Sequence, residues 1–289
     1  MSVPAIFIKE TVAKGNVVSW IWDKLTNVGW EMVSSNPSAE GRIFHSTGES
    51  TQDSFFILIG EFSNYMSTKQ TAVMVFTLLE GYTPGTPGVS GTKLNAAGLG
   101  YQYLFGANSS PLGPDALIDI YYHINKDRII LCFIPPLGFD TKTPKRSGMV
   151  YIGCPERFGI DISASHRSVI SIADHIAYTT SDISVQLYIS YPSAYNDAGV
   201  FGNIYSVGST FPSVKPNGKY MLYSVYVGNP SEGLRGKLDS VYCIIPNGLR
   251  TGDLITDDEY TYIVIATETG SSGLTNAVFP YNCFAIRIE

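Results

Sequence analysis

The sequence IDIYYHINKDRIILCFIPPLGFDTKTPKRSGMVYI, from Ile118 to Ile152, predicts two strands around a polar turn and a third strand after a polar loop. The turn is Asn125–Arg128, where Asn and Asp suit turn geometry because they bond local backbone groups. Apolar residues alternate with others on both sides of it, at Ile118, Ile120, Tyr122, Ile129, Leu131 and Phe133. Because this alternation gives each strand one apolar face, the stretch predicts a half-buried antiparallel sheet.

The composition is that of a folded chain that is sparing with charge. Of its 289 residues only 15% are charged and 44% are hydrophobic, which argues against disorder and against a coiled coil. The chain contains 28 glycines, 16 prolines and 19 tyrosines, a composition that favours strands joined by tight turns. The length allows two domains. The net charge of -6 gives no basic excess, so direct nucleic-acid binding is not expected.

Neither a membrane span nor a reactive cysteine pair is expected. The N-terminal residues lack a basic region followed by a long apolar run, and no later run approaches the roughly 18 apolar residues of a span. We therefore expect no membrane insertion and no export by the usual route. The cysteines are far apart and are interpreted as buried thiols, with disulfides formed outside the cell as the alternative: Cys132, Cys154, Cys243 and Cys283.

A helix is predicted near the start, from about Asn16 to Val28. Asn16 is the expected cap, apolar residues recur at helical spacing, and Gly29 suits the C-terminal stop. Strands are predicted after it at Trp30–Ser34, Arg42–Ser46, Ser54–Glu61 and Ala72–Leu79. A helix followed by a meander of strands predicts an α+β fold, here an N-terminal helix plus antiparallel sheet domain.

The segment 81–115 is rich in Gly, Pro and Tyr and has little periodicity. A connection this long is uncommon inside a compact domain. Two interpretations remain open: an arm that packs on a neighbouring subunit, or a loop folded over its own domain. Under the first, the candidate interface residues are Tyr82, Tyr101, Tyr103, Leu104 and Phe105.

The second half of the chain predicts a small, mainly β domain over residues 159–289, after an α+β domain over residues 1–158. Residues 168–177 suit a short helix or strand. Short strands follow, parted by turns such as Pro216–Gly218. They are predicted at Val185–Ser190, Gly202–Val207, Tyr220–Val227, Val241–Ile245, Tyr260–Thr267 and Phe284–Ile288.

Motifs for nucleophilic, nucleotide or metal chemistry are absent from the sequence. It contains neither G-x-S-x-G nor the phosphate loop G-x-x-x-x-G-K-[ST]. His166 and His175, with Asp174 beside the second, lack helical metal-site spacing. His45 and His123 fall in strand patterns and are interpreted as structural. We therefore predict no catalytic residue, no cofactor and no metal.

Carboxylates raise two weaker alternatives. Asp257, Asp258 and Glu259 form an acidic turn without the alternating ligands of a calcium loop, so a solvated turn is favoured. Glycoside hydrolysis needs only two carboxylates about 5 to 10 Å apart. The candidate acids beside aromatic residues are Glu61, Glu80 and Asp119.

Two segments resemble structural proteins of tailed bacteriophage virions. One is the stretch from Ile118, with its NKDRII turn and its VYIG strand. The other runs from Arg235 to Glu268, RGKLDSVYCIIPNGLRTGDLITDDEYTYIVIATE. With the helix and the GWEM that follows it, their order carries the resemblance. The matching positions in the second segment are Arg235, Gly236, Leu238, Val241, Tyr242, Leu249, Gly252, Asp253, Ile255, Tyr262 and Val264.

The resemblance implies a non-enzymatic component of a tail, baseplate or neck, which acts through subunit assembly. Its partners would be copies of itself and other virion proteins, and it would be assembled in the bacterial host cytoplasm and located in the virion. The low charge and many tyrosines fit surfaces that partners cover. The alternatives are a receptor-binding or adsorption protein that contacts a host surface sugar, and a tail-associated glycan hydrolase.

Overall fold

The structure is a computed structural model of the chain. It describes residues 4–34, 41–49, 55–62, 73–79, 82, 101–102, 106–107, 110–111, 113–134, 148–153, 156–157, 169–173, 185–189, 214–229, 233–244, 249–267 and 282–289. No helix among these residues is long and apolar enough to cross a membrane.

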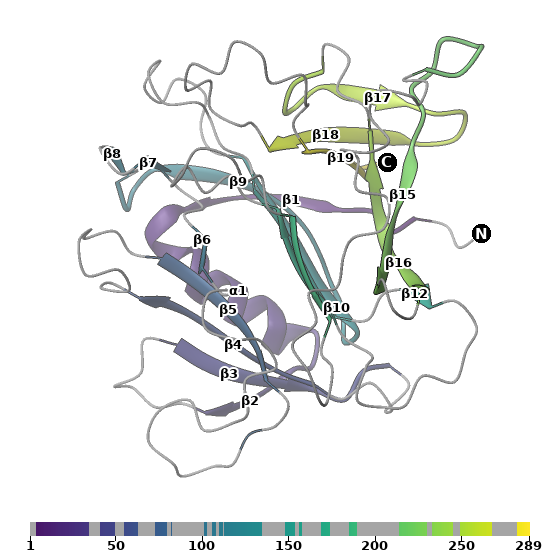
Figure 1. Ribbon diagram of the computed structural model, residues 1–289. Coiled ribbons are helices and arrows are strands. Elements are labelled where there is room, and N and C mark those ends of the chain that lie inside the picture. The colour runs from purple at the N-terminus through teal and green to yellow at the C-terminus, as the bar shows by residue number, and fades with distance from the viewer. Residues whose placement is uncertain are drawn as a thin grey trace.

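The fold is mostly β, which corrects the α+β class expected from the sequence. The described residues form nineteen strands, one α-helix and one short 3₁₀ turn. The strands build three larger sheets, and the helix lies between two of them (Figure 1). The prediction was wrong because the helix packs only between the five-stranded and central sheets, whereas the other face of the central sheet packs against a third sheet.

The central sheet is antiparallel and has the strand order β1-β9-β10-β11-β13-β14. The predicted hairpin lies at its middle, with Ile129 opposite Ile124 and Phe133 opposite Ile120. The third predicted strand is its next neighbour. The bounds are β1 Ile8–Ala13, β9 Leu117–Ile124, β10 Arg128–Ile134, β11 Gly148–Gly153, β13 Val169–Ala173 and β14 Val185–Ile189.

The five-stranded sheet has the order β2-β3-β4-β5-β6 and contains the four strands predicted after the helix. Its bounds are β2 Glu31–Ser34, β3 Gly41–Ser46, β4 Phe55–Phe62, β5 Val73–Leu79 and β6 Tyr101–Gln102. A separate pair joins β7 Gly106–Ala107 to β8 Ser110–Pro111.

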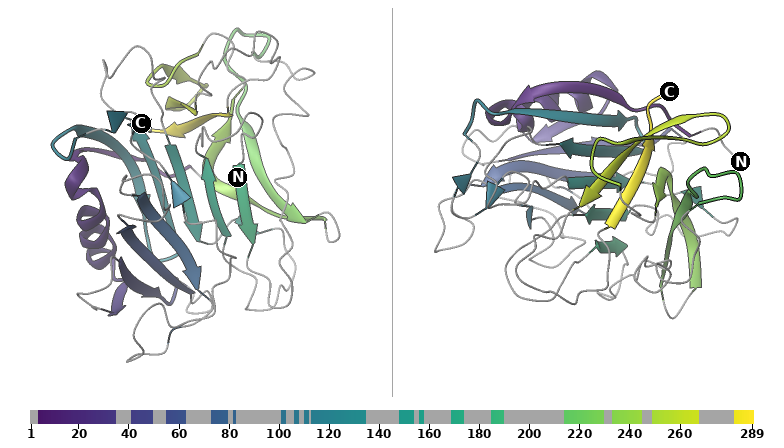
Figure 2. Two further views of the ribbon diagram at one scale, coloured as in Figure 1. Left: turned by 60° about the vertical axis from the view of Figure 1, so that its left-hand side comes forward. Right: turned by 90° about the horizontal axis from the view of Figure 1, so that it is seen from above.

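The C-terminal sheet has the order β12-β16-β19-β18-β17, and β15 also pairs with β16. The late strand β19 is thus inserted between β16 and β18 (Figure 2). The bounds are β12 Glu156–Arg157, β15 Tyr223–Asn229, β16 Gly233–Cys243, β17 Leu254–Thr256, β18 Thr261–Thr267 and β19 Asn282–Arg287. Residues 202–207, where another strand was predicted, lie outside the described part.

The helix α1, Val17–Asn27, follows the 3₁₀ turn Lys14–Asn16. Asn16 precedes α1 but makes no side-chain capping bond, so its predicted capping role is wrong. Gly29 ends the helix as expected, with φ at +90°, a conformation that glycine adopts without steric cost. Trp20 and Trp22 lie on different sides of the helix. The indole N–H of Trp20 donates to Glu10, and that of Trp22 donates to the carbonyl oxygen of Ile59.

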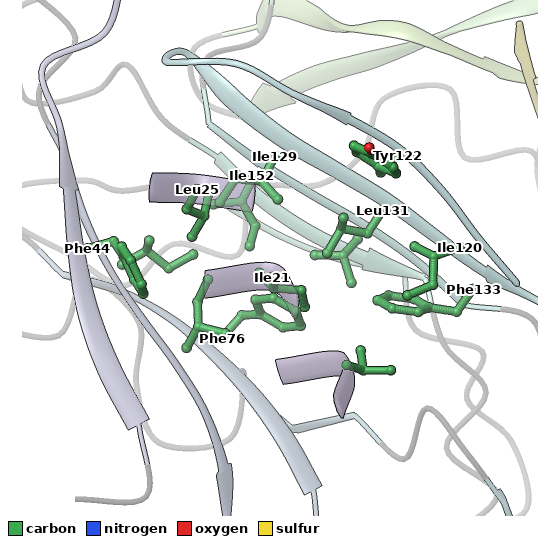
Figure 3. Close-up of a cluster of buried hydrophobic side chains, with 14 of the residues drawn as sticks. Ile21, Leu25, Phe44, Phe76, Ile120, Tyr122, Ile129, Leu131, Phe133 and Ile152 are labelled. Atoms are coloured by element: carbon green, nitrogen blue, oxygen red, sulfur yellow. The ribbon is translucent and has the colours of Figure 1, made fainter. Parts of the chain in front are cut away.

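The larger core lies between α1, the five-stranded sheet and one face of the central sheet (Figure 3). Ile21 and Leu25 of α1 are fully buried there. The predicted alternating set of the hairpin all points into this core: Ile118, Ile120, Tyr122, Ile129, Leu131 and Phe133.

The opposite face of the central sheet is covered at β10, which is buried on both sides, whereas β9 keeps partly exposed residues on that face; the half-buried pattern predicted for the hairpin is thus wrong for β10 alone. Ile130, Cys132 and Tyr151 on that face are fully buried against the C-terminal sheet. Phe7, just before β1, joins this second core. The central sheet also continues past residue 158 into β13 and β14. The proposed domain division at that position stays a prediction.

Candidate interaction surface

Strand β1 forms one edge of the central sheet among the described strands, and lies along one margin of the molecule (Figure 2). Lys14 donates its N–H to Ala116, on the β9 side. Phe7 donates its N–H to the carbonyl oxygen of Arg287 in β19 instead. Because backbone groups alternate in direction along an antiparallel strand, Lys9, Thr11 and Ala13 present theirs outward, as Phe7 does.

Glu10 of β1 accepts three side-chain hydrogen bonds on the helix side of the sheet. Its Oε1 lies 2.5 Å from Lys24 Nζ and 2.5 Å from the Tyr122 hydroxyl, and its Oε2 accepts from Trp20 Nε1 at 2.8 Å. Burial would raise the pKa of Glu10, but these donors outweigh it and lower the pKa to about 2. The carboxylate is therefore ionised and bound to α1 and β9.

Lys9 and Thr11 bind the same carboxylate on the opposite face. Lys9 Nζ lies 2.7 Å from Asp119 Oδ2, and Thr11 Oγ1 donates to Asp119 Oδ1 at 2.6 Å. Burial acts to raise the pKa of Asp119, and the bonds to Lys9 and Thr11 lower it below the ordinary value. The polar groups of Lys9, Glu10 and Thr11 are thus bound to β9 or α1, and no described strand pairs with the outer main-chain groups of β1.

Apolar side chains stay exposed near this edge. Ile6 and Ile8 are 51% and 56% exposed, and Leu117, at the start of β9, is 58% exposed. Other exposed large apolar residues lie elsewhere, among them Leu254 on the edge strand β17. The side chains of Ile6, Ile8 and Leu117 border a strand edge that no strand of the described residues covers.

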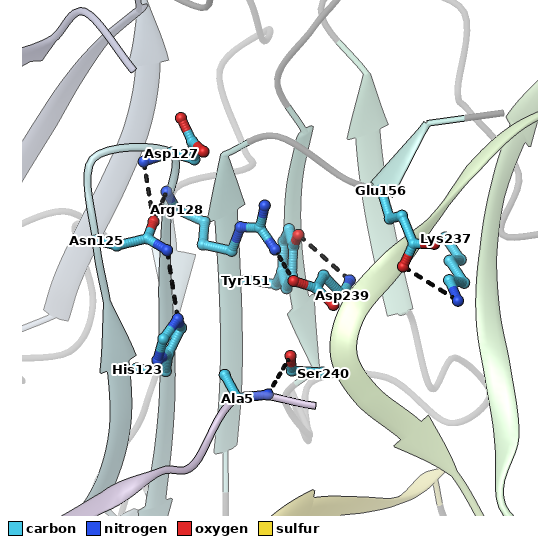
Figure 4. Close-up of polar contacts among 10 residues, drawn as sticks. All are labelled: Ala5, His123, Asn125, Asp127, Arg128, Tyr151, Glu156, Lys237, Asp239 and Ser240. Carbon is cyan, nitrogen blue, oxygen red and sulfur yellow. Dashed lines mark hydrogen bonds and ion pairs between the residues drawn. The ribbon is translucent and has the colours of Figure 1, made fainter. Parts of the chain in front are cut away.

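The predicted hairpin turn forms part of a polar seam with the C-terminal sheet (Figure 4). Asn125 Oδ1 accepts the backbone N–H groups of Asp127 and Arg128 at 2.9 and 3.0 Å. Arg128 forms an ion pair with Asp239 of β16, and the Arg128 side chain is only 14% exposed. Arg128 is thus covered by β16, and its charge lies between the two sheets and not at the surface.

An irregularity in β16 aims Asp239 at the turn. Pairing with β15 breaks between Tyr226, opposite Lys237, and Ser224, opposite Tyr242, so four residues of β16 lie opposite one residue of β15. Ser240 within the bulge has φ at +62°, which is rare for a residue with a Cβ. Its Oγ accepts the backbone N–H of Ala5 at 2.9 Å. The bulge therefore holds both the hairpin turn and the N-terminal segment.

His123 faces the same seam. Its Nε2 lies 3.3 Å from Asn125 Nδ2, and its ring centroid lies 5.9 Å from that of Phe7. Burial and the charge of Arg128 lower the pKa of His123, against a smaller opposing effect of Asp239. His123 is thus neutral at pH 7, in keeping with the structural role predicted for it.

The predicted interface residues fall in different places. Tyr82 packs, partly buried, against Ile43 and Leu58 on the outer face of the five-stranded sheet. Tyr101 belongs to β6, where its backbone pairs with Val75. Tyr103, Leu104 and Phe105 lie outside the described residues, so a role of this segment in a subunit interface stays a prediction.

The acidic turn is organised by local hydrogen bonds. Asp257 Oδ1 accepts the backbone N–H groups of Glu259 and Tyr260 at 2.8 Å each. Burial acts to raise the pKa of Asp257, but these bonds lower it. Asp258 lies 2.9 Å from Lys219 Nζ, which also donates to the carbonyl oxygen of Asp257. The turn is thus tied to the loop that precedes β15.

The remaining candidate groups have structural surroundings or lie outside the described side chains. His45 stacks on Phe56 with ring centroids 4.4 Å apart. Cys132 and Cys243 are buried free thiols, and burial raises the pKa of Cys132. Asp119 is held by Lys9 and Thr11. Outside the described side chains are Glu61, Glu80, Cys154, His166, Asp174, His175 and Cys283.

The sequence interpretation missed β1 and Glu10. The run IKETVA has apolar residues at Ile8 and Val12 with Glu10 between them, so polar and apolar residues share one strand face. Only the tertiary approach of α1 supplies the donors that satisfy Glu10. The β-branched residues of this run were nevertheless a readable strand signal.

Comparison with known proteins adds no relative. No protein-family model matches the chain, and no curated protein matches it significantly.

Proposed function

We propose that this chain is a non-enzymatic structural component of a tailed phage virion, in the tail, baseplate or neck, and that it acts by assembling with copies of itself and other virion proteins. The resemblance of two ordered segments supports this proposal. These segments form the hairpin β9–β10 with β11, and the strands β16, β17 and β18. The segments that carry the resemblance are thus the main packed strands of two sheets.

The proposal that the chain acts by assembly rests on the edge of β1, beside which the described part of the chain places no further strand. Lys9, Glu10 and Thr11 direct their polar groups to α1 and β9, and Ile8 stays exposed beside outward main-chain groups. An open edge of this kind binds another strand through main-chain hydrogen bonds. The ion pair between Arg128 and Asp239 supports a structural and non-enzymatic role, because it connects two sheets of the fold.

The adsorption alternative has one specific observation in its favour. Three tyrosines are partly buried on the face of the C-terminal sheet that points away from the central sheet: Tyr220, Tyr242 and Tyr260. Aromatic rings beside charged groups such as Asp257 and Arg287 suit contacts with sugar rings and hydroxyl groups. Binding of the purified chain to a panel of bacterial surface glycans tests this alternative.

Electron microscopy of a phage particle that carries this chain tests the main proposal. The expected result is density for several copies in a tail, baseplate or neck ring, with each copy in contact with its neighbours. Absence of the chain from purified particles, with the protein recovered only from the lysate of infected cells, would overturn the proposal. Glycan hydrolysis by the purified protein would instead move the enzymatic alternative to first place.

A further inference from the structure

We propose that His123 holds the N-terminal segment 4–7 as an acid-sensitive latch, so that protonation of its imidazole ring releases this segment from the junction between the central and C-terminal sheets. Segment 4–7 directly precedes β1, and its Ala5 contacts Ser240 of β16 close to His123 (Figure 4). The latch does not depend on the proposed assembly role, because it needs no partner and responds to pH alone.

The N-terminal segment is held by individual contacts and not by a strand ladder. The backbone N–H of Ala5 donates to Ser240 Oγ at 2.9 Å, and that of Phe7 donates to the carbonyl oxygen of Arg287 at 2.9 Å. The Arg287 guanidinium donates in turn to the carbonyl oxygen of Pro4 at 2.8 Å. The Phe7 ring is 3% exposed and packs in the core between the two sheets. Loss of these few contacts would free the segment without opening a sheet.

The hairpin turn next to His123 selects the neutral form of its ring. Asn125 Oδ1 accepts the backbone N–H groups of Asp127 and Arg128, so the amide nitrogen Nδ2 of Asn125 faces His123 Nε2, at 3.3 Å. An amide nitrogen can only donate, which assigns Nε2 as the acceptor and places the proton of the neutral ring on Nδ1. The turn therefore binds the neutral imidazole in one tautomer.

A second proton on His123 would break this arrangement. The Nε2–H of the imidazolium would point at Asn125 Nδ2, which is itself a donor. Rotation of the Asn125 amide would turn Oδ1 toward His123, but it would take Oδ1 away from the two backbone N–H groups of the turn. Protonation thus costs either the contact with His123 or the two hydrogen bonds that close the turn.

The charges around His123 also oppose protonation. Arg128 and Asp239 already form an ion pair, so an imidazolium would leave one positive charge unbalanced in the polar seam. Burial and the charge of Arg128 lower the pKa of His123, and Asp239 opposes them with a smaller effect. Asp239 is thus the carboxylate that acts on His123, and Arg128 already binds it.

Other charged and titratable groups on the neighbouring elements have contacts of their own. On the turn, Asp127 accepts the backbone N–H of Glu49, and the Lys126 side chain lies beside Gly29. The contacts on the other elements are those of Lys9 with Asp119 and Tyr121, of Arg287 with Tyr260, of Lys237 with Glu156, and of the Tyr151 hydroxyl with the backbone N–H of Asp239.

Segment 4–7 is the cover of His123 that opens most easily. An imidazolium needs water or a partner, because burying an unpaired charge is costly. The Phe7 ring centroid lies 5.9 Å from that of His123, with the planes at 50°, at the outer limit of a cation–π contact. Ile130, opposite His123 on β10, is held in a ladder between β9 and β11. The segment without a ladder therefore moves first and lets water reach the ring.

Hydrogen exchange of the full-length protein, resolved to single amides, tests the latch. Between pH 7.5 and pH 5.0 the protection factors of Ala5 and Phe7, which are corrected for intrinsic exchange, are expected to fall at least about threefold. The fall arises because the released histidine, with its ordinary pKa of 6.5, binds a proton that the latched histidine resists. A wild type whose two amides keep the same protection over this range overturns the proposal.

Low concentrations of urea separate release of the segment from unfolding of the whole chain. A local opening exposes little surface, so the exchange of Ala5 and Phe7 should not respond to urea. The amides of Leu131 and Val150, paired between β10 and β11, should exchange faster as urea increases. If all four amides share one urea dependence, the segment opens only with the whole protein and the latch is wrong.

The variant Asn125→Asp should keep the segment in place at low pH. One carboxylate oxygen can still accept the two N–H groups of the turn, and the other stands where Nδ2 donates, so the imidazolium gains an acceptor. The protection of Ala5 and Phe7 should then be at least as high at pH 5.0 as at pH 7.5. A fall like that of the wild type contradicts the latch.

The variant His123→Phe keeps an aromatic ring beside Phe7 but removes the titrating group. Its protection at Ala5 and Phe7 should be the same at both pH values, and a persistent fall would assign the effect to another group and overturn the proposal. If His123→Phe does not fold, Asn125→Asp alone decides the outcome, because it retains the histidine and the acceptor that the turn requires.

Discussion

Arg128, at the end of the hairpin turn, forms an ion pair with Asp239 in the bulge of β16. The two residues lie on different sheets, and both side chains are mostly buried, with 14% and 26% exposure. The backbone N–H of Asp239 also points to the Tyr151 hydroxyl at 3.5 Å. A charged contact thus helps to fix how the central and C-terminal sheets meet.

Removing Asp239 should destabilise the protein because it leaves the Arg128 charge in the seam without its carboxylate. We expect Asp239→Ala to lower the free energy of unfolding by about 2 to 3 kcal/mol, measured by urea denaturation. The control is Asp258→Asn, which alters an exposed pair with Lys219 and should change stability little. Equal losses in the two variants would contradict a special role for the seam.

The hairpin turn should depend more on Asn125 than on Asp127. Asn125 Oδ1 accepts two backbone N–H groups within the turn, whereas Asp127 Oδ1 accepts one, from Glu49, at 2.7 Å. We expect losses of about 2 kcal/mol for Asn125→Ala and about 1 kcal/mol for Asp127→Ala in thermal and urea unfolding. Loss of a hydrolytic activity in Asp127→Ala, at unchanged melting temperature, would instead support the enzymatic alternative.

Gly153 at the end of β11 should tolerate no side chain. Its φ is +125°, and an added Cβ would overlap the carbonyl oxygen of Asp127 and the backbone of Arg128. Gly153→Ala is therefore expected to cost about 3 kcal/mol or more, or to abolish soluble expression. Gly113→Ala is the control, because a Cβ there meets open space. A fully stable Gly153→Ala variant would show that the turn can move away.

Glu10 should make the protein sensitive to strong acid. Its folded pKa of about 2 lies below the ordinary value of 4.5, so the unfolded chain binds the proton first as the pH falls. Its stabilising effect is thus complete above about pH 4.5 and is lost between there and about pH 2. Glu10→Gln should flatten the stability profile in this window, measured by urea unfolding at a series of pH values. An unchanged profile would mean that other carboxylates dominate.

His123 should act in a higher pH window. Its pKa is lowered from 6.5, so the unfolded chain takes up a proton that the folded chain resists. Stability should therefore fall as the pH drops below about 6.5, until the folded histidine itself titrates. His123→Asn should remove this slope between pH 7.5 and the onset of carboxylate titration, as followed by the urea midpoint. A slope that persists in the variant would assign it to another group.

Individual strands and the helix could be predicted where the apolar pattern of a single segment determines the element. The strands at Arg42–Ser46 and Ala72–Leu79 match β3 and β5 within one residue, and the hairpin around Asn125 is confirmed. The fold class could not be predicted, because the number of layers depends on which faces meet. The run from Ile129 to Phe133 is buried on both sides, although its alternation was interpreted as one apolar face.

The polar contacts between the two sheets and those of β1 could not be predicted from the sequence. Arg128 and Asp239 are separated by 111 positions, and the partners of Glu10 come from β9 and α1. Sequence patterns report which face of an element is apolar, whereas such pairs depend on the approach of distant elements. The bulge that aims Asp239 carries no glycine at its left-handed position Ser240, so the usual local signal for it is missing.

The insertion of β19 between β16 and β18 sets an order on biosynthesis. During translation β16 and β18 leave the ribosome before residues 282–287, so neither can complete its ladder until the later strand arrives. Ile263 and Ile265 of β18, which end fully covered beside Phe284 and Ile286, stay without that cover meanwhile. Folding that depends on non-local strand pairing is slow, and it leaves unpaired strand edges that can aggregate. The edges of β16 and β18 that pair with β19 therefore stay open in the growing chain until residues 282–287 are available.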